Sequence, residues 1–509
     1  MHMSKKVLFP ILIFATVVIY ILTLKGALGN PTPEEVENGL DQNTMSMELS
    51  PERGRYALVM SLVHDSSFAL SETLARAVYP DVGYYNGRYY IYFVPGISLL
   101  AVPLYIWGYQ YQMAQVFTFF LPAIFALLNA VFIYQICRKV FKQPAWAGLF
   151  AALVFCFGST SWSYAVTLYQ HQTTTFFLLS AFYAVWKFRE GTRAKWIYPL
   201  WVWTCLGLTL TLDYPNALFM APVMIYFAFS AFEISQKAKS IEVNVHLSAV
   251  ITSVVFLSLV LLHGFYNYTQ FGDPWRVSGS LPGTKLVTEA ATFNTPERAS
   301  LVQLIEKKKD VVKFFSEQKF PNGLYELTVS SDRGLLVYSP IFILGFAGLV
   351  IYLKRYAGWE TSVPAACLAA IFFLYSSWGD PWGGWAFGPR YLIPAMGILS
   401  IFVSGFLVES KKYMFKVLAF VLFAYSSAVS LLGVITTNAI PPKSEAVILK
   451  TGYNFLRSFE FFRDNRSSSF VYNTWFSHLP LWLYVLPIYL AVIAAAGIFL
   501  FRLPKDKKS

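Results

Sequence analysis

Long apolar runs separated by short polar connections make up most of the sequence. The first run extends from Val7 to Leu24 and is interrupted only by Thr16, Tyr20 and Thr23. In a helix these residues would cover about 27 Å, close to the thickness of the hydrocarbon core of a bilayer. Similar runs follow along the chain, so we predict about twelve transmembrane helices, near residues 7–24, 113–136, 146–163, 170–186, 196–212, 215–231, 247–265, 335–353, 361–377, 391–407, 417–436 and 479–501.

The composition agrees with a chain embedded in a membrane. The 509 residues are 56% hydrophobic and only 13% charged, whereas soluble proteins carry about 25% charged residues. Lys5 and Lys6 precede the first apolar run as in a signal peptide, but no small-residue cleavage site follows, so we expect this run to be retained as the first helix. The sequence therefore predicts an all-α integral membrane protein with a single polytopic domain over residues 1–509.

Basic residues occur in short clusters that fall in alternate connections between the apolar runs. Examples are the segments 138–142, 187–195 and 411–416. Loops rich in Lys and Arg stay on the cytoplasmic side, so this alternation predicts a multi-pass protein of the inner (plasma) membrane with both termini in the cytoplasm. The net charge of +12 is thus a topology signal. Nucleic acid is not expected as a partner, because the basic residues form no continuous stripe.

The same topology leaves three long connections on the extracytoplasmic side, near residues 25–112, 266–334 and 437–478. Within the first, residues 94–108 are apolar but short, and they contain several helix breakers. We therefore expect an interfacial helix there, as for the amphipathic stretch 55–63. The chemistry of the protein is expected in these outer loops.

Ionisable residues are nearly absent from the apolar runs. Asp213, Asp380 and Arg390 stand at the expected outer ends of helices. A charge at mid-membrane costs about 2.5–3.5 kcal/mol on insertion scales and marks a transport pathway. Its absence argues against a proton-coupled carrier. It favours a site at the outer leaflet, which a lipid reaches from one side and an acceptor from the other.

Several outer segments carry motifs that together resemble a known family. The motifs are RYALVMSLV from Arg55, DVGYYNGRYYIYFVPGISLLAVPLY from Asp81, FGSTSWSYAVTLYQH ending at His171, YNYTQFGDPW from Tyr266, DRGLLVYSPI from Asp332 and WGGWAFGPRYLIP from Trp382. In this order and topology they resemble the GT-C superfamily of polytopic glycosyltransferases that use lipid-phosphate sugars. The similarity is to its bacterial branch, which is related to protein O-mannosyltransferases and lipid A aminoarabinose transferases (glycosyltransferase family 39-like).

The resemblance implies a GT-C-like fold and an inverting glycosyltransferase, a hexosyl or pentosyl transferase. It would move a monosaccharide from a polyprenyl-phosphate carrier to an acceptor hydroxyl on a glycan, lipid or protein, on the extracytoplasmic side of the membrane. Such a transfer needs a carboxylate that accepts the proton of the hydroxyl. Asp81 and Glu52 are the candidates for this base. The choice stays open, because relatives often carry a pair of adjacent acids in the first loop and this chain has only separated ones.

The departing phosphate needs cations, and the sugar needs a surface. The guanidinium group of arginine offers a fixed fork of donors to phosphate, and Arg390, after Gly388 and Pro389, is the first candidate; a helix-end anchor to any lipid headgroup is the alternative. Relatives often carry a lysine before the Pro-Gly pair, where this chain has residues 91–94 without one. The further candidates for binding phosphate or sugar, each with an ordinary structural role as the alternative, are Arg55, Arg88, Arg333, His171, Tyr90 and Trp385.

No metal site is expected, because the sequence has no HExxH, DxD or His/Cys cluster. No cofactor should be required, although a loosely bound divalent cation stays open as an alternative. Two other functions also stay open. A lipid-glycan flippase or transporter would be expected to show paired halves and ionisable groups deep within spans. A GT-C-like scaffold subunit without catalysis would agree with the missing lysine and the separated acids.

Overall fold

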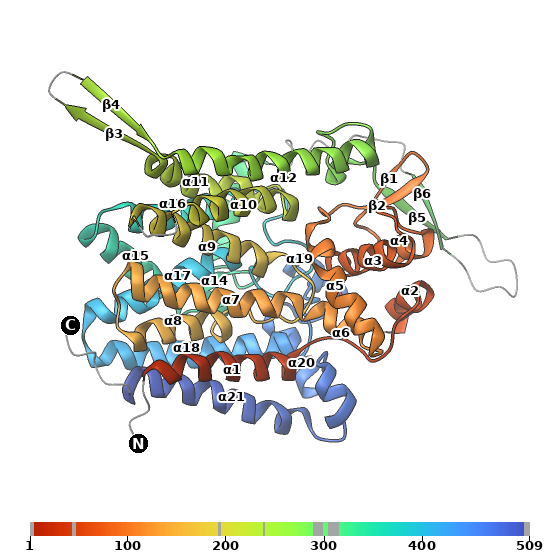
Figure 1. Cartoon of the computed structure of the whole chain (residues 1–509). Helices are drawn as coiled ribbons and strands as arrows, with labels where there is room; N and C mark the ends of the chain where they lie inside the picture. The colour runs from red at the N-terminus through yellow and green to blue at the C-terminus, as the bar shows by residue number, and fades with distance from the viewer. Residues whose placement is uncertain are drawn as a thin grey trace, which may run out of the picture.

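Most of the long helices run side by side in one bundle (Figure 1). The computed structural model describes residues 5–42, 47–191, 195–237, 240–288, 299–303 and 315–502. The two chain ends lie on the left of Figure 1, while the helices of the first long connection, from α2 (Pro33–Gln42) to α5 (Gly96–Gln110), lie on the right. This connection therefore packs at the end of the bundle opposite to the termini.

Each of the twelve apolar runs coincides with a helix. The second run is continuous from Ala114 to Val140, where α6 (Ala114–Phe119), α7 and the π-helical turn η1 (Ile136–Val140) follow one another. The helices at the twelve runs are α1 (Lys5–Thr23), α7 (Leu121–Gln135), α8 (Ala145–Phe157), α9 (His171–Arg189), α10 (Ile197–Leu212), α11 (Asn216–Ala231), α12 (Leu247–Phe271), α15 (Phe342–Arg355), α16 (Trp359–Ser376), α17 (Ile393–Ser410), α18 (Tyr413–Ile435) and α21 (Leu481–Gly497).

Among the described residues, six helices are long and apolar enough to cross a membrane by length and composition. They are Ala114–Val140, Leu247–Phe271, Trp359–Ser376, Arg390–Ser410, Tyr413–Ile435 and Leu481–Arg502, the last of which includes the turn η7 (Ile498–Arg502). Four further apolar helices are shorter, namely Phe9–Thr23, Ala145–Phe157, Ile197–Leu212 and Asn216–Ala231. The structure thus confirms a mostly helical fold with apolar helices long enough for a membrane.

The first long connection folds into short helices and one hairpin. Its elements are α2 (Pro33–Gln42), α3 (Ser50–His64), α4 (Glu72–Val78), β1 (Val82–Tyr85), β2 (Arg88–Ile91) and α5 (Gly96–Gln110). The short apolar segment 94–108 forms α5, as expected. The stretch 55–63 lies within α3, but Tyr56 and Val59 of this helix are fully buried. It is therefore a packed helix and not the amphipathic surface helix that the sequence indicated.

Among the described residues there are also three two-stranded hairpins, none of which was predicted from the sequence. In the first, β1 pairs with β2 around Asn86 and Gly87, both of which have positive φ. An Asn-Gly pair is the usual turn of a tight hairpin, so this sequence signal was available. The other two pair β3 (Phe232–Lys237) with β4 (Ser240–Val245), and β5 (Thr284–Thr288) with β6 (Ala299–Gln303).

The second and third long connections pack over the same end of the bundle as the first. The backbone N–H of Tyr84 in β1 donates to the carbonyl of Pro282 at 2.9 Å, so the segment just before β5 runs beside β1. The remaining elements of these connections and of the helix starts are η2 (Ser278–Ser280), η4 (Glu317–Lys319), α13 (Phe320–Thr328), α14 (Leu335–Tyr338), η5 (Arg390–Leu392), α19 (Lys443–Leu449), α20 (Phe455–Arg463) and η6 (Tyr472–Phe476).

The centre of the bundle is formed by α8, α9 and α17, whose residues are almost all buried. Helix α15 approaches α17 very closely: a Cβ atom at Gly348 would lie 2.0 Å from the carbonyl oxygen of Phe402. Glycine permits such backbone contact between membrane helices. Helix α12, at the top of Figure 1, packs mainly on α10 and leaves most of its apolar surface exposed. An exposed apolar helix of this length is typical of a lipid-facing position.

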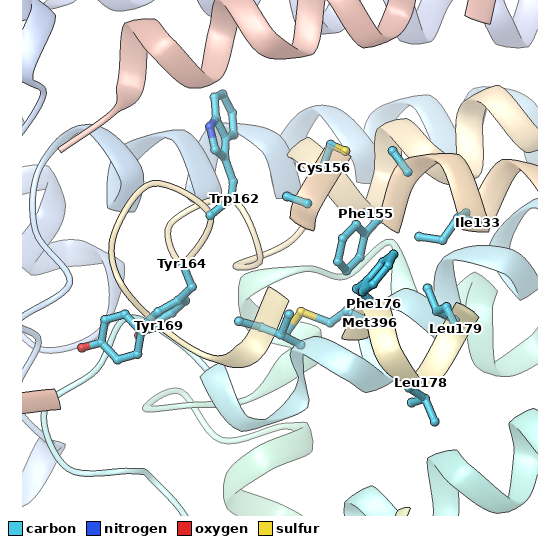
Figure 2. Packing of buried hydrophobic residues seen from close by; sticks show 14 of the residues in the cluster. Ile133, Phe155, Cys156, Trp162, Tyr164, Tyr169, Phe176, Leu178, Leu179 and Met396 are labelled. Atoms are coloured by element: carbon cyan, nitrogen blue, oxygen red, sulfur yellow. The ribbon is translucent and has the colours of Figure 1, made fainter. Parts of the chain in front are cut away.

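The loop between α8 and α9 carries aromatic side chains from the core towards the end of the bundle that bears the long connections. Figure 2 shows Phe155, Phe176 and Met396 packed together among the helices, with Tyr164 and Tyr169 on the loop to one side. The hydroxyl of Tyr169 points away from this apolar cluster. The loop thereby connects the hydrophobic core to the polar groups described next.

Candidate active site

A cleft of about 910 Å³ opens where the outer connections meet the bundle. One wall is apolar and comes from two helices that pack against each other: Leu218 and Ala221 of α11, and Phe373 and Leu374 of α16. Leu218 and Phe373 are both exposed although they are apolar. The opposite wall comes from the outer connections and includes Tyr92, Val277, Gly279, Phe315 and Trp378. An apolar surface therefore leads directly into a site built by the loops.

Three polar side chains lie between these two walls, and we call them the polar row. Nη2 of Arg55 donates to Oε1 of Gln170 at 2.6 Å, and Nε2 of Gln170 donates to Oδ2 of Asp213 at 3.2 Å. All three residues line the cleft. They come from α3, from the loop before α9 and from the turn between α10 and α11. Only the folded chain brings these distant segments together.

Burial changes the proton affinities of both charged members of the polar row. It lowers the pKa of Arg55 to about 10, although Tyr169 and Asp213 partly offset this effect. It raises the pKa of Asp213, while the hydrogen bond from Gln170 and the charge of Arg55 act in the opposite direction. At neutral pH Arg55 is therefore a cation, because a pKa of about 10 still lies well above 7. The cleft thus contains a guanidinium group that is only 2% exposed.

A second buried guanidinium group lies behind Tyr169. The ring of this tyrosine is 5.6 Å from the guanidinium carbon of Arg55 and 5.5 Å from that of Arg390. Nη2 of Arg390 donates to the carbonyl of Gly383 at 2.7 Å, and among the described residues its Nε–H has no partner. Arg390 is 9% exposed and does not line the cleft, so it is enclosed by protein at the start of α17. Two cations therefore bracket one aromatic ring.

His171 belongs to the same aromatic group. Its ring stacks on Tyr169 with a centroid distance of 5.9 Å and meets Tyr391 edge-on at 6.2 Å. It is buried, and no hydrogen bond of its ring is found among the described residues. The structure thus brings His171, Arg55 and Arg390 around Tyr169. The sequence had named these three as phosphate or sugar ligands from separate motifs.

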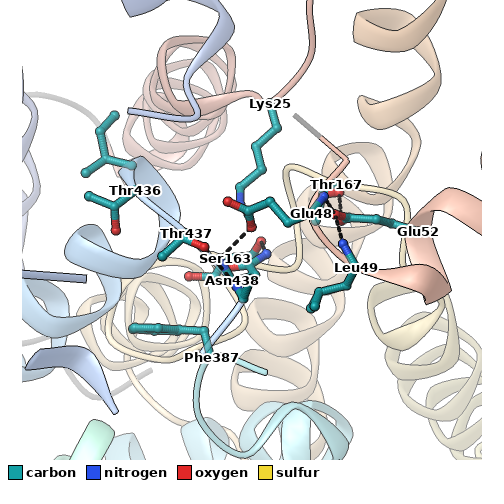
Figure 3. A network of polar contacts seen from close by, with 12 residues as sticks. Lys25, Glu48, Leu49, Glu52, Ser163, Thr167, Phe387, Thr436, Thr437 and Asn438 are labelled. Atoms are coloured by element: carbon teal, nitrogen blue, oxygen red, sulfur yellow. Dashed lines mark hydrogen bonds and ion pairs between the residues drawn. The ribbon is translucent and has the colours of Figure 1, made fainter. Parts of the chain in front are cut away.

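The two acids named as candidate bases differ in their surroundings. Glu52 is fully buried: one carboxylate oxygen accepts from the backbone N–H groups of Glu48 and Leu49, and the other accepts from the hydroxyl of Thr167. These bonds cap the start of α3. Burial raises the pKa of Glu52, whereas the charge of Lys25 lowers it. Figure 3 shows Glu52 enclosed beside Glu48 and Thr167.

Asp81 is half-buried at the start of β1 and lies outside the residues that line the cleft. Its Oδ2 accepts from the hydroxyl of Ser50 at 2.6 Å, and its carbonyl accepts from the backbone N–H of Tyr92 at 3.1 Å. The charge of Asp81 acts on both Arg55 and Tyr92, which do line the cleft. Asp81 therefore stands next to the cleft wall.

The other candidate ligands lie in different settings. Arg333 is fully buried and donates to the side chain of Asp332 and to the carbonyls of Trp382, Gly384 and Ile440, so it fastens the loop that precedes α17. Arg88 is exposed at the start of β2. Tyr90 packs against Phe271 with a centroid distance of 5.1 Å, and Nε1 of Trp385 donates to Glu445 at 2.6 Å. None of these four lines the cleft.

Sequence reasoning did not name two members of the polar row as site residues. Asp213 was recognised only as an acid at a helix end, and Gln170 was not singled out. Among the described residues, no group of three or more His, Cys, Asp and Glu side chains is arranged to hold a metal ion. Chemically, the cleft can hold an anion beside Arg55, an apolar chain along α11 and α16, and a further polar molecule under the outer loops.

No family model matches the chain, and no curated protein matches it. Solved structures to which it is similar include ArnT from Cupriavidus metallidurans bound to undecaprenyl phosphate, with 11% sequence identity, 96% of this chain and 77% of that chain covered, and a TM-score of 0.49. Another is the archaeal oligosaccharyltransferase AglB from Archaeoglobus fulgidus in complex with an inhibitory peptide and a dolichol-phosphate, with 14% identity, 92% and 59% coverage, and a TM-score of 0.45. At such low identity these likenesses say nothing about individual site residues.

Proposed function

We propose that this chain is an inverting glycosyltransferase that moves a monosaccharide from a polyprenyl-phosphate carrier to an acceptor hydroxyl. One observation carries the proposal: the cleft joins an apolar wall on the bundle to a buried, positively charged guanidinium group. A lipid phosphate has the matching combination of an apolar chain and an anionic head. A soluble sugar nucleotide has no apolar chain that could pack against the wall formed by α11 and α16.

The lipid chain lies against that apolar wall. Leu218 and Ala221 of α11, and Phe373 and Leu374 of α16, face the cleft. Isoprenoid units packed here exchange contacts with other lipid tails for contacts with this wall, so the wall orients the carrier at the site. Because Leu218 and Phe373 of this wall are exposed apolar side chains, the carrier reaches the cleft along them from the bilayer.

The phosphate binds at Arg55, and Arg390 supports it from behind Tyr169. A guanidinium group has five N–H donors, and the bonds of Arg55 to the carbonyl of Pro51 at 2.9 Å and to Gln170 at 2.6 Å leave others for phosphate oxygens. Charge develops on the phosphate as the glycosidic bond breaks. Donors fixed in a site without water stabilise such charge best. Arg88, Arg333 and His171 remain weaker candidates for this role.

The acceptor hydroxyl attacks the anomeric carbon from the side of the outer connections, and a single displacement inverts the configuration. Asp81 is the first-loop candidate for the base, since it lies next to Tyr92 in the cleft wall. Glu52 is the weaker choice, because its carboxylate oxygens already accept hydrogen bonds from the backbone just before α3 and from Thr167. Aromatic side chains of the outer connections, Tyr90 and Trp385 among the candidates, would stack on sugar rings.

The site works on the extracytoplasmic side of the inner (plasma) membrane. We propose that the twelve helices at the apolar runs all span the bilayer, with both termini in the cytoplasm. The position of the first connection at the end of the bundle opposite to the chain ends supports this topology, as do the basic clusters in alternate connections. The acceptor is a glycan, lipid or protein on that side. The reaction requires no cofactor, and a loosely bound divalent cation is the alternative.

The test is to give the purified protein a panel of polyprenyl-phosphate sugars and a mixture of acceptors, and to follow the release of polyprenyl phosphate. Release with inversion at the anomeric carbon is expected, and chelation of divalent cations should not abolish it. Transport of a labelled lipid-linked glycan across vesicles without release would favour the flippase. A donor that binds but is never consumed would favour the inactive scaffold.

A further inference from the structure

The walls of the cleft contain one carboxylate in the described part of the chain, that of Asp213. A glycosyl transfer at this cleft, as proposed above, needs a group that accepts the proton of the acceptor hydroxyl. Lipid phosphate leaves without a proton, so one acid is enough. Asp213 shares the polar row with Arg55, so it is a candidate for the group that accepts this proton.

The backbone holds Asp213 firmly at the edge of the cleft. At the end of α10, the N–H of Asp213 donates to the carbonyl of Thr209 at 3.3 Å. At the start of α11, the carbonyl of Asp213 accepts from the N–H of Asn216 at 3.1 Å. Pro215 stands between the two helices and also lines the cleft. The backbone of Asp213 is thus fixed by a tight turn between two packed helices.

The side chain of Asp213 is only partly used by the protein. Its Oδ2 accepts from Nε2 of Gln170 at 3.2 Å, whereas Oδ1 accepts no hydrogen bond from any described residue. A carboxylate can accept about four hydrogen bonds. Asp213 therefore has free lone pairs that face the cleft, as a proton acceptor requires.

Gln170 keeps Asp213 and Arg55 apart although both lie in the polar row. A direct ion pair would use the donors of the guanidinium group and lower the basicity of the carboxylate. The neutral amide instead accepts from Arg55 at 2.6 Å and donates to Asp213 at 3.2 Å. It orients both groups and leaves each able to act on a different part of the substrate.

The other acids near the cleft have less suitable surroundings. Glu52 is fully buried with both oxygens engaged, and Asp81 holds the hydroxyl of Ser50 outside the cleft. Asp380 accepts from the N–H of Gly383 at 3.2 Å in the loop that carries Arg390, and it does not line the cleft. Among the described acids, Asp213 is the one that lines the cleft, and one of its carboxylate oxygens accepts no hydrogen bond from a described residue.

We propose that Asp213 is the catalytic base of the transfer and that Gln170 is its positioning residue. The acceptor hydroxyl oxygen forms a bond to the anomeric carbon while the bond from that carbon to the phosphate oxygen breaks. The electron pair of the broken bond stays on the phosphate, which leaves as polyprenyl phosphate beside Arg55. The hydroxyl proton moves to Asp213.

Several titratable groups surround this carboxylate and bear on its pH dependence. The charge of Arg55 in α3 acts on Asp213. The charge of Asp213 in turn acts on Tyr214 in the same turn, Tyr375 in α16 and Tyr391 in η5. Burial raises the pKa of Asp213. Since a base must be ionised, kcat should fall as the pH drops through that raised value.

The experiment measures kcat, the KM for a polyprenyl-phosphate sugar and the pH profile for the wild type and variants. Asp213→Asn should lower kcat by about 10²–10⁴-fold, remove the acidic limb from the remaining rate and leave the donor KM nearly unchanged. Asp213→Glu should restore part of the rate. Gln170→Leu should move the acidic limb to higher pH, which a merely structural role would not do. Asp464→Asn, at an exposed acid that pairs with Arg463, is the control and should behave as wild type.

Two results would overturn the proposal while the proposed function stands. One is an active wild type in which Asp213→Asn keeps its kcat and its acidic limb. The other is loss of both in Asp81→Asn but not in Asp213→Asn. A folded Asp213→Asn protein, verified by its thermal unfolding midpoint and donor affinity, ensures that lost activity is not lost structure. A wild type that consumes no donor at all would overturn the proposed function and this inference together.

Discussion

Two groups of buried charged residues lie at the end of the bundle that bears the long connections. In one group the charges are paired within the protein, and in the other they keep free hydrogen-bonding capacity. In the closed network of Figure 3, Nζ of Lys25 pairs with Glu48 at 2.9 Å, Glu48 also accepts from the N–H of Asn438 at 2.6 Å, and Glu52 is bound by Thr167. In the polar row, Arg55 and Asp213 keep free donors and acceptors that face a cavity.

The difference teaches how to tell a structural charge from a functional one. The closed network joins the end of α1, the start of α3, the loop before α9 and the chain after α18, and protein groups surround its charges. The polar row also joins three segments, but a neutral amide separates its charges and a cleft of about 910 Å³ adjoins them. Free hydrogen-bonding capacity next to a cavity, more than burial itself, marks the candidate site.

The largest expected effect on this comparison comes from breaking the closed network. Lys25→Met leaves Glu48 and Glu52 without their cation, and removal of one partner of a buried ion pair costs about 3–5 kcal/mol. The thermal or denaturant unfolding midpoint in detergent should fall accordingly, while the donor KM of the folded protein stays unchanged. The double variant Lys25→Met/Glu48→Gln should recover part of the loss. An unchanged midpoint in Lys25→Met would contradict a structural role for the network.

The second prediction concerns the cation of the polar row. Arg55→Ala removes the donors that face the leaving phosphate, and loss of one preorganised donor typically lowers kcat by about 10²–10³-fold. Arg55→Lys should retain part of the rate, because it keeps the charge but not the fork of donors. Arg463→Ala, at an exposed arginine, serves as control in the same assay. Equal activity of all three proteins would exclude Arg55 from phosphate binding.

The third prediction concerns the contact of Arg390 with Gly383, in the loop before α17. Gly383 and Gly384 both have positive φ, at 72° and 63°, so an alanine strains the backbone similarly at either site. A Cβ atom at Gly383 would lie 3.2 Å from Nε of Arg390, whereas one at Gly384 would meet only Asp380, at 3.8 Å. Gly383→Ala should therefore reduce kcat/KM about tenfold more than Gly384→Ala, as expected for about 1.4 kcal/mol. Equal losses in kinetic assays would mean that backbone strain alone is responsible.

The smallest expected effect is the pH dependence that Glu52 contributes to stability. Burial raises the pKa of Glu52 in the folded protein, so the folded state binds this proton more tightly than the unfolded state. The free energy of unfolding should thus increase as pH falls from neutral through that raised pKa, with a slope of up to about 1.4 kcal/mol per pH unit. Glu52→Gln should flatten this part of the curve. A slope that survives the substitution would have to come from other groups.

Much of the helical architecture could be predicted, but less of the candidate site. Each apolar run became a helix, because hydrophobicity over such lengths is a local property. The Asn86-Gly87 pair is likewise a local signal in the sequence, and it indicates a hairpin turn. Gln170 could not be found, since a lone glutamine before a helix carries no distinguishing pattern. Its importance comes only from the two side chains that it joins across the fold.

The sequence by itself determined where the helices form, that they are apolar enough for a membrane, and which charged residues stand at their ends. Tertiary structure alone decided which of those charges share a cleft. Arg333 and Arg390 both belong to outer motifs. Backbone carbonyls and Asp332 accept hydrogen bonds from Arg333, whereas the Nε–H of Arg390 behind Tyr169 has no partner in the described part of the chain. Asp213 likewise became a candidate base only through its cleft and its distant partners. The physical reason is that the hydrophobicity of a segment follows from its local sequence. Whether a donor or acceptor stays free depends instead on which distant residues the tertiary structure places next to it.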